Sequence, residues 1–244
     1  MLNRLSAPIT AMLLAFGLPA SAELSPGHQV DEGVDIIVGE EDATHELMVY
    51  FSPGCPGCIV LHDFLSDLYE RGVSEDRLRI VYRLVPAFYH RGGNNQLAEM
   101  RSDWMGRWLQ CTYTTGGADS FDAALDVFIS YAMSTNRRFE GEITWPAIPN
   151  GRFASFRTLL RERGVYADPD QPACDSERAR DIFARNVVLL GQTAGEDRSR
   201  VQAPMLILDG RWLDRPIAER RAWDLFALLE FSIFQTGMFP GGEQ

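Results

Sequence analysis

The sequence contains no lysine, and all 23 of its basic residues are arginines. Catalysis through a lysine amine is therefore excluded. Basic residues are also outnumbered, because 34 aspartates and glutamates give a formal net charge of −11. A chain of this charge is not expected to bind nucleic acid or an anionic membrane surface. Histidine is scarce too, with four residues. His28, His45 and His90 stand in no recognisable motif.

Long apolar runs are missing beyond the first 22 residues, so no later segment is expected to span a bilayer. At the N-terminus, Arg4 precedes an apolar run centred on residues 12–16, and small residues follow at Ala20-Ser21-Ala22. This pattern predicts a signal peptide over residues 1–22, cleaved after Ala22. No cysteine follows the cleavage site, so no lipid anchor is expected. The mature protein should be exported to an oxidising compartment, where disulfides persist.

Cysteine is sparse, but two of the four cysteines form the motif Cys55-Pro56-Gly57-Cys58. The apolar run Leu47–Phe51 before it predicts a short buried strand. After it, apolar residues recur at helical spacing and predict an amphipathic helix; they are Leu61, Phe64, Leu65 and Leu68. Cys55 is thus expected at the N-cap of this helix, with Pro56 at the first helical position, where its missing N–H costs nothing.

The two thiols are expected to play different roles. At a helix N-terminus, unpaired backbone N–H groups and the helix dipole favour the thiolate of Cys55, which should be the exposed nucleophile. Cys58 lies one turn into the helix on its apolar side and should be the resolving thiol, which closes the ring and releases the partner. Pro56 and Gly57 between them are expected to tune the reduction potential.

The rest of the chain predicts an α/β fold. The runs Val34–Val38, Leu47–Phe51 and Leu78–Val85 predict strands, which form a right-handed parallel βαβ unit with the intervening helix. From about Asn94 to Gly191 the apolar spacing is helical, and core packing is expected for its aromatic residues. Four helices are predicted there, and they carry Leu97, Met100, Trp104 and Trp108; Phe121, Leu125, Phe128 and Ile129; residues 153–163; and Ile182, Phe183, Val187 and Leu190.

Strand character returns at Met205–Leu208 and Arg211–Leu213. The dipeptide Asp209-Gly210 between these runs predicts a tight β-hairpin. A closing helix is expected next, with Trp223, Phe226, Ala227 and Glu230 along it.

This order of elements, with a Cys-x-x-Cys at the first helix, resembles the thioredoxin fold with a helical insertion found in DsbA-like thiol:disulfide oxidoreductases of the bacterial periplasm. One motif is Phe51-Ser52 leading into the dithiol, and the other is Val-Gln-Ala-Pro-Met-Leu-Ile-Leu-Asp-Gly at 201–210. The resemblance covers residues 34–236. It implies a cis Ala203-Pro204 bond lying against the dithiol and contacting substrate, whereas the residues alone also allow a trans proline that begins a strand.

The resemblance also divides the chain. Residues 23–93 and 196–244 would form the two halves of the thioredoxin-like domain, and residues 94–195 the all-helical insertion. The chain departs from the family at two places. Gly57 leaves the dithiol motif without the histidine that many strong oxidants of the family carry. Val49 occupies the position, six residues before the nucleophile, where members often carry a buried carboxylate.

Two polar residues near the dithiol have less definite roles. Glu46 is expected to be a solvent-facing edge residue, too far along its strand to replace the missing acid. His62, four residues after Cys58, is expected on partly exposed helix surface, with a role beside Cys58 as the alternative.

The other cysteines, Cys111 and Cys174, lack Cys-x-x-Cys spacing. In an oxidising compartment we expect them to form one structural disulfide that closes the helical block, worth about 4 kcal/mol in the entropic model. Two free thiols, or a second redox couple, are the alternatives.

The sequence therefore predicts a periplasmic thiol:disulfide oxidoreductase that oxidises or exchanges disulfides in exported proteins. Its only redox group would be the Cys55–Cys58 pair, without metal or cofactor. Expected partners are exported proteins with thiols or disulfides and a membrane or soluble redox protein that recycles the pair, and a monomer is expected. The alternatives are an isomerase or reductase for specific clients and a non-enzymatic copper- or zinc-binding module, since Cys-x-x-Cys is half of a zinc site.

Overall fold

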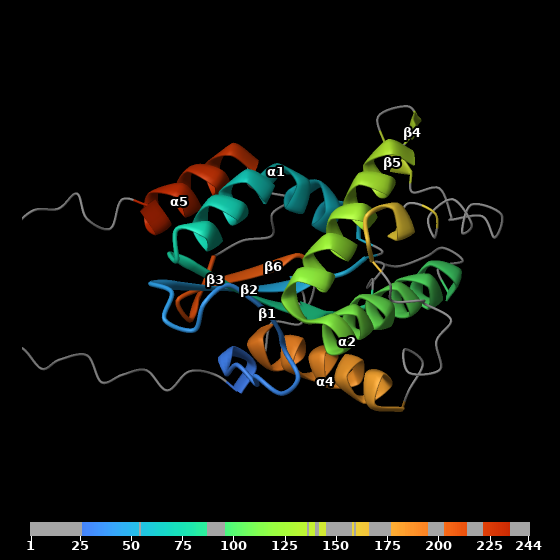
Figure 1. Cartoon of the computed structure of the whole chain (residues 1–244), viewed down its shortest axis with the longest axis horizontal. Coiled ribbons are helices and arrows are strands. Elements are labelled where there is room, and N and C mark those ends of the chain that lie inside the picture. Colours follow the sequence, from blue (N-terminus) through green and yellow to red (C-terminus); the bar gives the residue numbers. More distant parts are fainter. Residues whose placement is uncertain are drawn as a thin grey trace, which may run out of the picture.

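A five-stranded mixed sheet lies at the centre of the computed structural model of this chain (Figure 1). Its strands follow the order β1 (Ile36–Val38), β3 (Leu78–Leu84), β2 (His45–Phe51), β6 (Met205–Leu208) and β7 (Arg211–Trp212). β2 and β3 are parallel, and the other neighbours are antiparallel. The structure describes residues 26–53, 55–86, 96–135, 137–139, 142–144, 158, 160–165, 177–194, 203–213 and 222–234.

Helices cover both faces of the sheet. α1 and α5 lie over one face, and α4 and the short 3-10 helix η1 lie under the other (Figure 1). The non-strand elements and the small hairpin are η1 (Pro26–His28), α1 (Pro56–Ser74), α2 (Gln96–Thr135), β4 (Arg137–Phe139), β5 (Glu142–Thr144), α4 (Glu177–Ala194) and α5 (Ala222–Phe234). The predicted α/β class is confirmed, as is the predicted order of a βαβ unit followed by helices and a C-terminal hairpin and helix.

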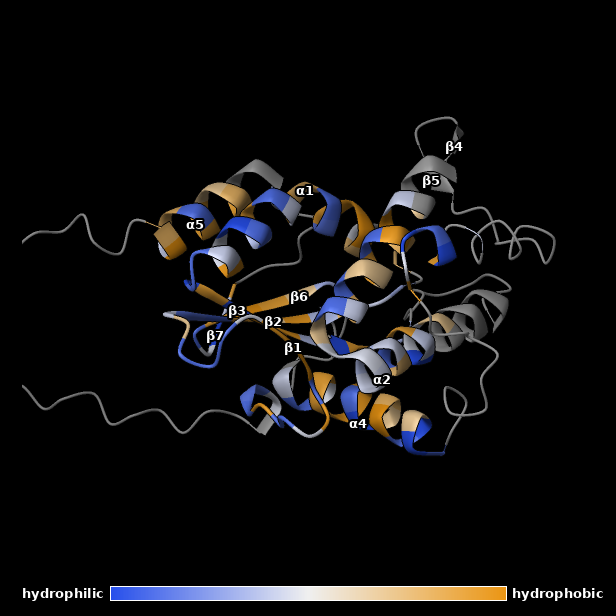
Figure 2. Ribbon diagram, viewed as in Figure 1, coloured by the Kyte–Doolittle hydropathy of each residue, from blue (hydrophilic) through white to orange (hydrophobic). Residues whose placement is uncertain are grey.

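The central strands are apolar because both of their faces are buried. Figure 2 shows this as hydrophobic colour along β2 and β6. On one face, Val49 and Phe51 of β2 pack in a cluster that includes Leu65 of α1 and Leu229 of α5. On the other face, Tyr50 belongs to a second cluster that includes residues of β3, β6 and α4. Alternate residues of β2 therefore serve two cores.

α2 consists of two helices that meet at Gly117, where φ is 74° and ψ is −165°. This backbone conformation favours glycine, and it ends one helix and begins the next. The two halves correspond to the two helices predicted from the sequence. Trp108 in the first half and Phe121 in the second are buried, as predicted for core residues. The side chains of Leu97, Met100 and Trp104 lie outside the described residues.

The Asp209-Gly210 hairpin is confirmed. β6 and β7 are joined by these two residues, with φ of 50° and 72°, which is the type I′ geometry that matches strand twist. The turn is also tied to β2, because His45 Nδ1 lies 2.8 Å from Asp209 Oδ2. The backbone N–H of Glu46 donates to Asp209 Oδ1 at 2.9 Å. Both carboxylate oxygens of Asp209 thus hold the turn against the beginning of the central strand β2.

Several details differ from the sequence predictions. β1 begins at Ile36 instead of Val34, because the side chain of Asp35 forms a buried ion pair with Arg83. The prediction that residues 94–195 are all helical was wrong, because the antiparallel hairpin of β4 and β5 lies within this range. Of the helix predicted over 153–163, residues 158 and 160–163 are described; residues 158 and 160–162 are helical, and residue 163 is in a turn. Among the described helices, none is long and apolar enough to cross a membrane. The predicted domain bounds stay predictions.

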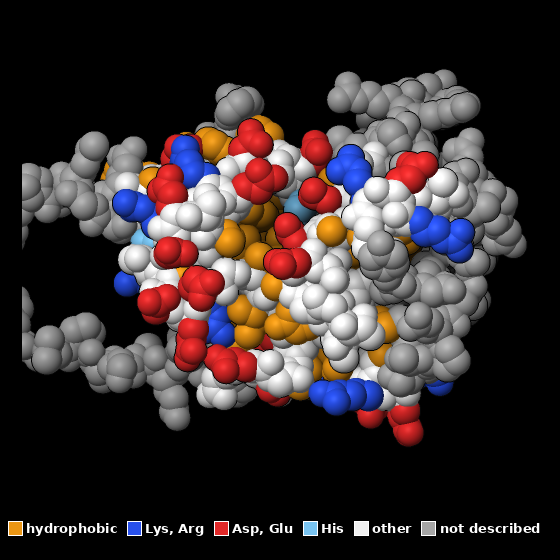
Figure 3. Space-filling model, in the orientation of Figure 1, with side chains coloured by type: hydrophobic (Ala, Val, Ile, Leu, Met, Phe, Trp, Pro, Cys, Tyr) orange, Lys and Arg blue, Asp and Glu red, His pale blue; other side chains and the backbone are white. Residues whose placement is uncertain are grey.

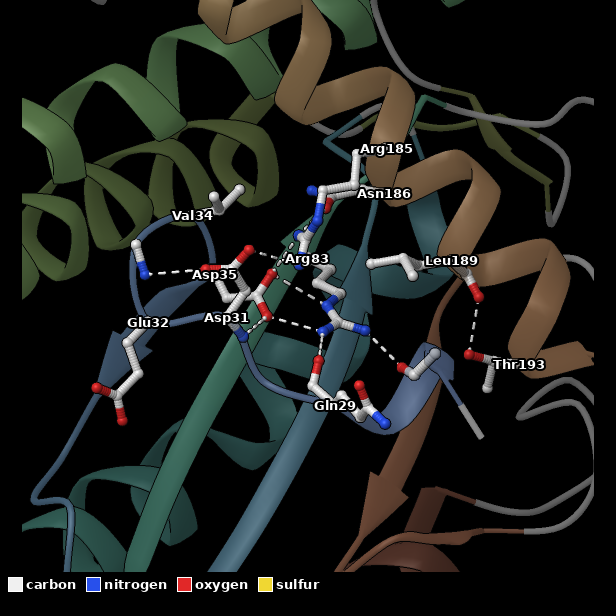
Figure 4. A network of polar contacts seen from close by, with 12 residues as sticks. Gln29, Asp31, Glu32, Val34, Asp35, Arg83, Arg185, Asn186, Leu189 and Thr193 are labelled. Carbon is white, nitrogen blue, oxygen red and sulfur yellow. Dashed lines mark hydrogen bonds and ion pairs between the residues drawn. The ribbon is translucent and has the colours of Figure 1, made fainter. Parts of the chain in front are cut away.

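A buried ion pair fixes the segment before β1 to the sheet (Figure 4). Arg83 of β3 contacts both carboxylate oxygens of Asp35, with Nη2 2.7 Å from Oδ2, and neither side chain is exposed. Arg83 also donates to the backbone carbonyls of Gly27 and Gln29 and to the Tyr50 hydroxyl. From α4, Arg185 Nη1 reaches Asp35 Oδ1 at 2.8 Å. The guanidinium of Arg83 therefore joins η1, the segment before β1, β2 and β3.

Candidate functional site

The dithiol lies where β2 ends and α1 begins. Cys55 is the N-cap of α1 and Pro56 occupies its first turn, as predicted. The backbone N–H of Cys55 donates to the Ser52 carbonyl at 3.0 Å, and the N–H of Cys58 donates to the Cys55 carbonyl at 3.1 Å. A tight turn thus carries the chain from the strand into the helix. Both Cys55 and Cys58 are free thiols, so the structure represents the reduced pair.

Cys55 is partly buried and its sulfur is activated by its neighbours. A hydrogen bond from the Cys58 thiol is the main cause that lowers the pKa of Cys55, and the N–H groups of Cys58 and Gly57 act in the same direction. Burial opposes these effects without reversing them. When protonated, the Cys55 thiol donates to the Ala203 carbonyl at 3.2 Å. The helix N-terminus therefore does favour the thiolate, as the sequence predicted.

Cys58 is in the opposite environment. It is 1% exposed and packs in the apolar cluster below α1. Burial raises the pKa of Cys58 well above its usual value, and the hydrogen bond and charge of Cys55 add to the effect. The Ser52 N–H, 3.4 Å from Cys58 Sγ, partly offsets it. The two pKa values are thus driven apart, which suits an attacking sulfur and a buried resolving one.

The segment before β6 completes the site. The Ala203–Pro204 peptide bond is cis, as the family resemblance implied. A Cβ placed on Gly57 would lie 3.7 Å from Pro204 Cδ and 3.8 Å from Cys55 Sγ. These are ordinary van der Waals distances, so the motif glycine lies between the proline and the nucleophile. Residues about 150 positions apart in the sequence therefore meet at one surface.

Among the carboxylates that the structure describes, none acts on Cys58 in place of the acid that the sequence lacks. Val49 is 3% exposed and belongs to the same apolar cluster as Cys58. Glu46 lies five residues before Phe51, the last residue of β2, which places it about 16 Å along the strand from the end that leads to the dithiol. Its predicted edge position was wrong, because β2 lies between β3 and β6. Glu46 is partly buried there, and this burial raises the pKa of Glu46.

The predicted exposure of His62 was also wrong. His62 is 9% exposed, and its Nε2 lies 3.2 Å from the Tyr82 hydroxyl. The rings of Phe51 and Tyr69 meet it edge-on. Burial lowers the pKa of His62 to about 4. It is therefore a neutral core residue at physiological pH.

Ser52 is the site residue whose contact with Cys58 was not predicted from the sequence. It is fully buried, and its side-chain Oγ has no hydrogen-bond partner among the described residues. Its position directly after the buried strand was the available clue, since the turn into the helix must place the next backbone N–H near the resolving thiol.

Ser52→Ala is expected to leave the free energy of unfolding unchanged or to raise it by about 1 kcal/mol, because it removes an unpaired buried hydroxyl and keeps the backbone N–H that contacts Cys58. Urea unfolding of the reduced protein measures this. Ser66→Ala is the matched control, since that exposed hydroxyl donates to the Asp63 carbonyl. A loss above about 1 kcal/mol for Ser52→Ala would contradict the expectation and show that the hydroxyl has a partner.

Of the remaining cysteines, Cys111 is disulfide-bonded and 5% exposed. Cys174 lies outside the described residues, so its pairing with Cys111 stays a prediction. Among the described residues, no group of three or more histidine, cysteine, aspartate or glutamate side chains is arranged to hold a metal ion.

Comparisons with known proteins agree with this geometry. A thioredoxin family model matches residues 31–131. No curated protein matches the sequence. Among solved structures, BdbD from Bacillus subtilis in its oxidised form is similar, with a TM-score of 0.55 and 12% identity over 86% of this chain and 99% of that one. MdbA, a thiol-disulfide oxidoreductase from Corynebacterium diphtheriae, gives a TM-score of 0.55 and 12% identity over 81% of this chain and 90% of the other.

The catalytic domain of Proteus mirabilis ScsC gives a TM-score of 0.52 and 11% identity, covering 83% of this chain and 91% of that domain. The chain therefore has the thioredoxin-like fold of these proteins.

Proposed function

We propose that this chain is a thiol:disulfide oxidoreductase of the periplasm that oxidises or exchanges disulfides in exported proteins. The observation that carries the proposal is the opposite environment of two sulfurs one helical turn apart. Cys55 is reachable and has a lowered pKa, whereas Cys58 is buried and has a raised one. The similarity to a thiol-disulfide oxidoreductase and the predicted signal peptide support it.

The reaction begins from the Cys55–Cys58 disulfide. A client thiolate attacks Cys55 Sγ, the bond between the two sulfurs breaks, and Cys58 leaves as a thiolate that takes up a proton. A mixed disulfide then joins Cys55 to the client. A second client thiolate attacks the client sulfur of that bond, and Cys55 leaves as a thiolate. The client gains a disulfide, and two electrons reduce the protein pair.

The site residues divide this work. The lowered pKa of Cys55 makes its sulfur a good leaving group in the second step. The Ser52 N–H faces the sulfur of Cys58 where negative charge develops in the first step. The Ala203 carbonyl and Pro204 border the nucleophile and would contact the client backbone. A redox partner, membrane-bound or soluble, must then reoxidise the pair.

The function is tested by following disulfide exchange against pH. Oxidised protein mixed with a client peptide that contains two cysteines should yield the peptide disulfide and one reduced Cys55–Cys58 pair. In the reduced protein, the rate of Cys55 alkylation is followed against pH. Its midpoint pH should lie below that of an ordinary cysteine, since the thiolate is the reactive form and the pKa of Cys55 is lowered. Cys58→Ala should move the midpoint up, because it removes the main hydrogen bond to Cys55.

The reduction potential against glutathione decides the direction. A value near about −120 mV supports oxidation, and a value near about −270 mV supports the alternative of a reductase. No peptide disulfide formation, with an ordinary alkylation midpoint, would refute the proposed function.

A further inference from the structure

A second feature lies away from the dithiol. A cavity of about 240 Å³ opens between α1, the second half of α2 and the β1–β3 edge of the sheet. Figure 3 shows it as a hollow with apolar side chains at its floor and carboxylates around it. Val38, Val73 and Ile80 contribute apolar side chains, and Tyr69 and Tyr82 contribute aromatic ones. Its volume is below the range of about 300–1,000 Å³ that is usual for small-molecule sites.

The rim of this cavity carries uncompensated negative charge. Glu70 comes from α1, and Asp122 and Asp126 come from α2. None of the three forms an ion pair with a residue in the described part of the chain. Burial, and then the charges of Asp126 and Glu70, raise the pKa of Asp122 to about 6. A positively charged group at this position would relieve that repulsion.

The wall of the cavity includes a tyrosine whose side chain is mostly buried. Tyr69 is 5% exposed and lines the cavity, and its hydroxyl has no hydrogen-bond partner among the described residues. Burial raises the pKa of Tyr69, so the phenol stays neutral. His62 also lines the cavity, but it is neutral and its Nε2 is occupied by Tyr82. The cavity therefore offers an acceptor and three carboxylates, with no cation from His62.

We propose that this cavity binds the side chain of an arginine residue in a polypeptide partner. The aliphatic stem of arginine fits the apolar floor. Its planar guanidinium stacks on tyrosine rings and forms paired hydrogen bonds with carboxylates. The small volume suits one side chain better than a free cofactor. Positive charge, aliphatic length and a planar head are thus each matched by a group that lines the cavity.

The cavity is within reach of a polypeptide that reacts at the dithiol, a step that rests on the proposed function. His62 and Glu70 lie about 10 and 22 Å from Cys55 along α1, at 1.5 Å per residue. An extended chain advances about 3.3 Å per residue. A client arginine three to seven residues from the reacting cysteine would therefore reach the cavity.

Binding is tested with N-acetyl-arginine amide and its uncharged analogue, N-acetyl-citrulline amide. In NMR titrations of the full chain, the arginine probe should shift signals of Tyr69, Asp122 and Ile80 and lower the pKa of Asp122. The citrulline probe should bind at least tenfold more weakly. Asp122→Asn with Asp126→Asn should abolish the difference, whereas Asp67→Asn, at an exposed position of α1 outside the cavity, should keep it.

A second arm uses two cysteine peptides that differ only in arginine or citrulline five residues from the cysteine. With the wild type, the arginine peptide should exchange at least threefold faster than the citrulline peptide. With the Asp122→Asn/Asp126→Asn variant, the two peptides should exchange at the same rate. Equal binding of both small probes, or perturbation of the cavity by Ca²⁺ and not by the arginine probe, would overturn the proposal. Absence of all exchange while the arginine probe still binds would refute the proposed function and leave the cavity assignment standing.

Discussion

Cys55→Ser is expected to lower thiol–disulfide exchange by at least about 10³-fold, because a serine hydroxyl is not ionised at neutral pH and cannot form the mixed disulfide. Cys55 is the reachable sulfur of the pair, and its neighbours lower its pKa. The measurement is the rate of disulfide formation in a two-cysteine peptide. Loss of the rate should leave the fold intact, since both side chains are similar in size and the site is at a helix end.

Cys58→Ser is the matched variant for this experiment. It keeps the nucleophile and removes the resolving thiol, so the variant is mixed with a client peptide that already holds a disulfide. The Cys55 thiolate attacks that bond and releases one client sulfur as a thiolate, and the mixed disulfide should accumulate as added mass because no Cys58 thiol displaces it. Cys58 is 1% exposed, which prevents it from replacing Cys55 as the first point of attack. Exchange at the wild-type rate in Cys55→Ser, or accumulation of adducts on Cys58, would contradict the assignment of roles.

Arg83→Met is expected to lower the free energy of unfolding by about 3–5 kcal/mol, the largest effect on stability that the structure predicts. The substitution leaves the carboxylate of Asp35, which is fully buried, without its bidentate partner. It also removes the donors to the carbonyls of Gly27 and Gln29. Urea unfolding measures the change. Arg77→Met is the control, because its ion pair with Glu75 is exposed and should be worth less than about 1 kcal/mol.

The same ion pair gives the wild type a pH dependence. Burial alone would raise the pKa of Asp35, but the hydrogen bonds and charge of Arg83 outweigh it and lower the pKa. Stability from this pair is therefore complete above the unfolded pKa of about 3.9 and is lost as the pH falls through the lower folded pKa.

An equal loss of stability for Arg83→Met and Arg77→Met at neutral pH would show that the network does not hold the N-terminal segment.

Features with local sequence signatures were predicted well. The strand run at Leu47–Phe51 and the proline after Cys55 were enough to place the nucleophile at a helix N-cap. The turn at Asp209-Gly210 followed from the preference of type I′ turns for these residues. Each of these signatures lies within a few residues of the structure it predicts, so tertiary packing had little chance to override it.

Features that depend on strand order were not predictable. Glu46 was read as an edge residue because the sequence does not show that β6 pairs with β2. His62 was placed at the surface because its burial needs Phe51 of β2 and Tyr82 of β3, in addition to Tyr69 of its own helix. Arg83 and its partner Asp35 are 48 residues apart in the sequence. An arginine in a strand otherwise suggests a side chain that faces solvent.

The antiparallel ladder between β2 and β6 has a consequence for how this fold can diversify. Four residue pairs, ending at Tyr50 and Met205, align the strand before Cys55 with the strand after Pro204. The reactive sulfur and its proline neighbour are thus brought together without any residue of α2 or α4 between them. Changes in length or surface between β3 and β6 would therefore leave this alignment intact, as long as the core-facing residues of α2 and α4, such as Phe121 and Leu190, are kept.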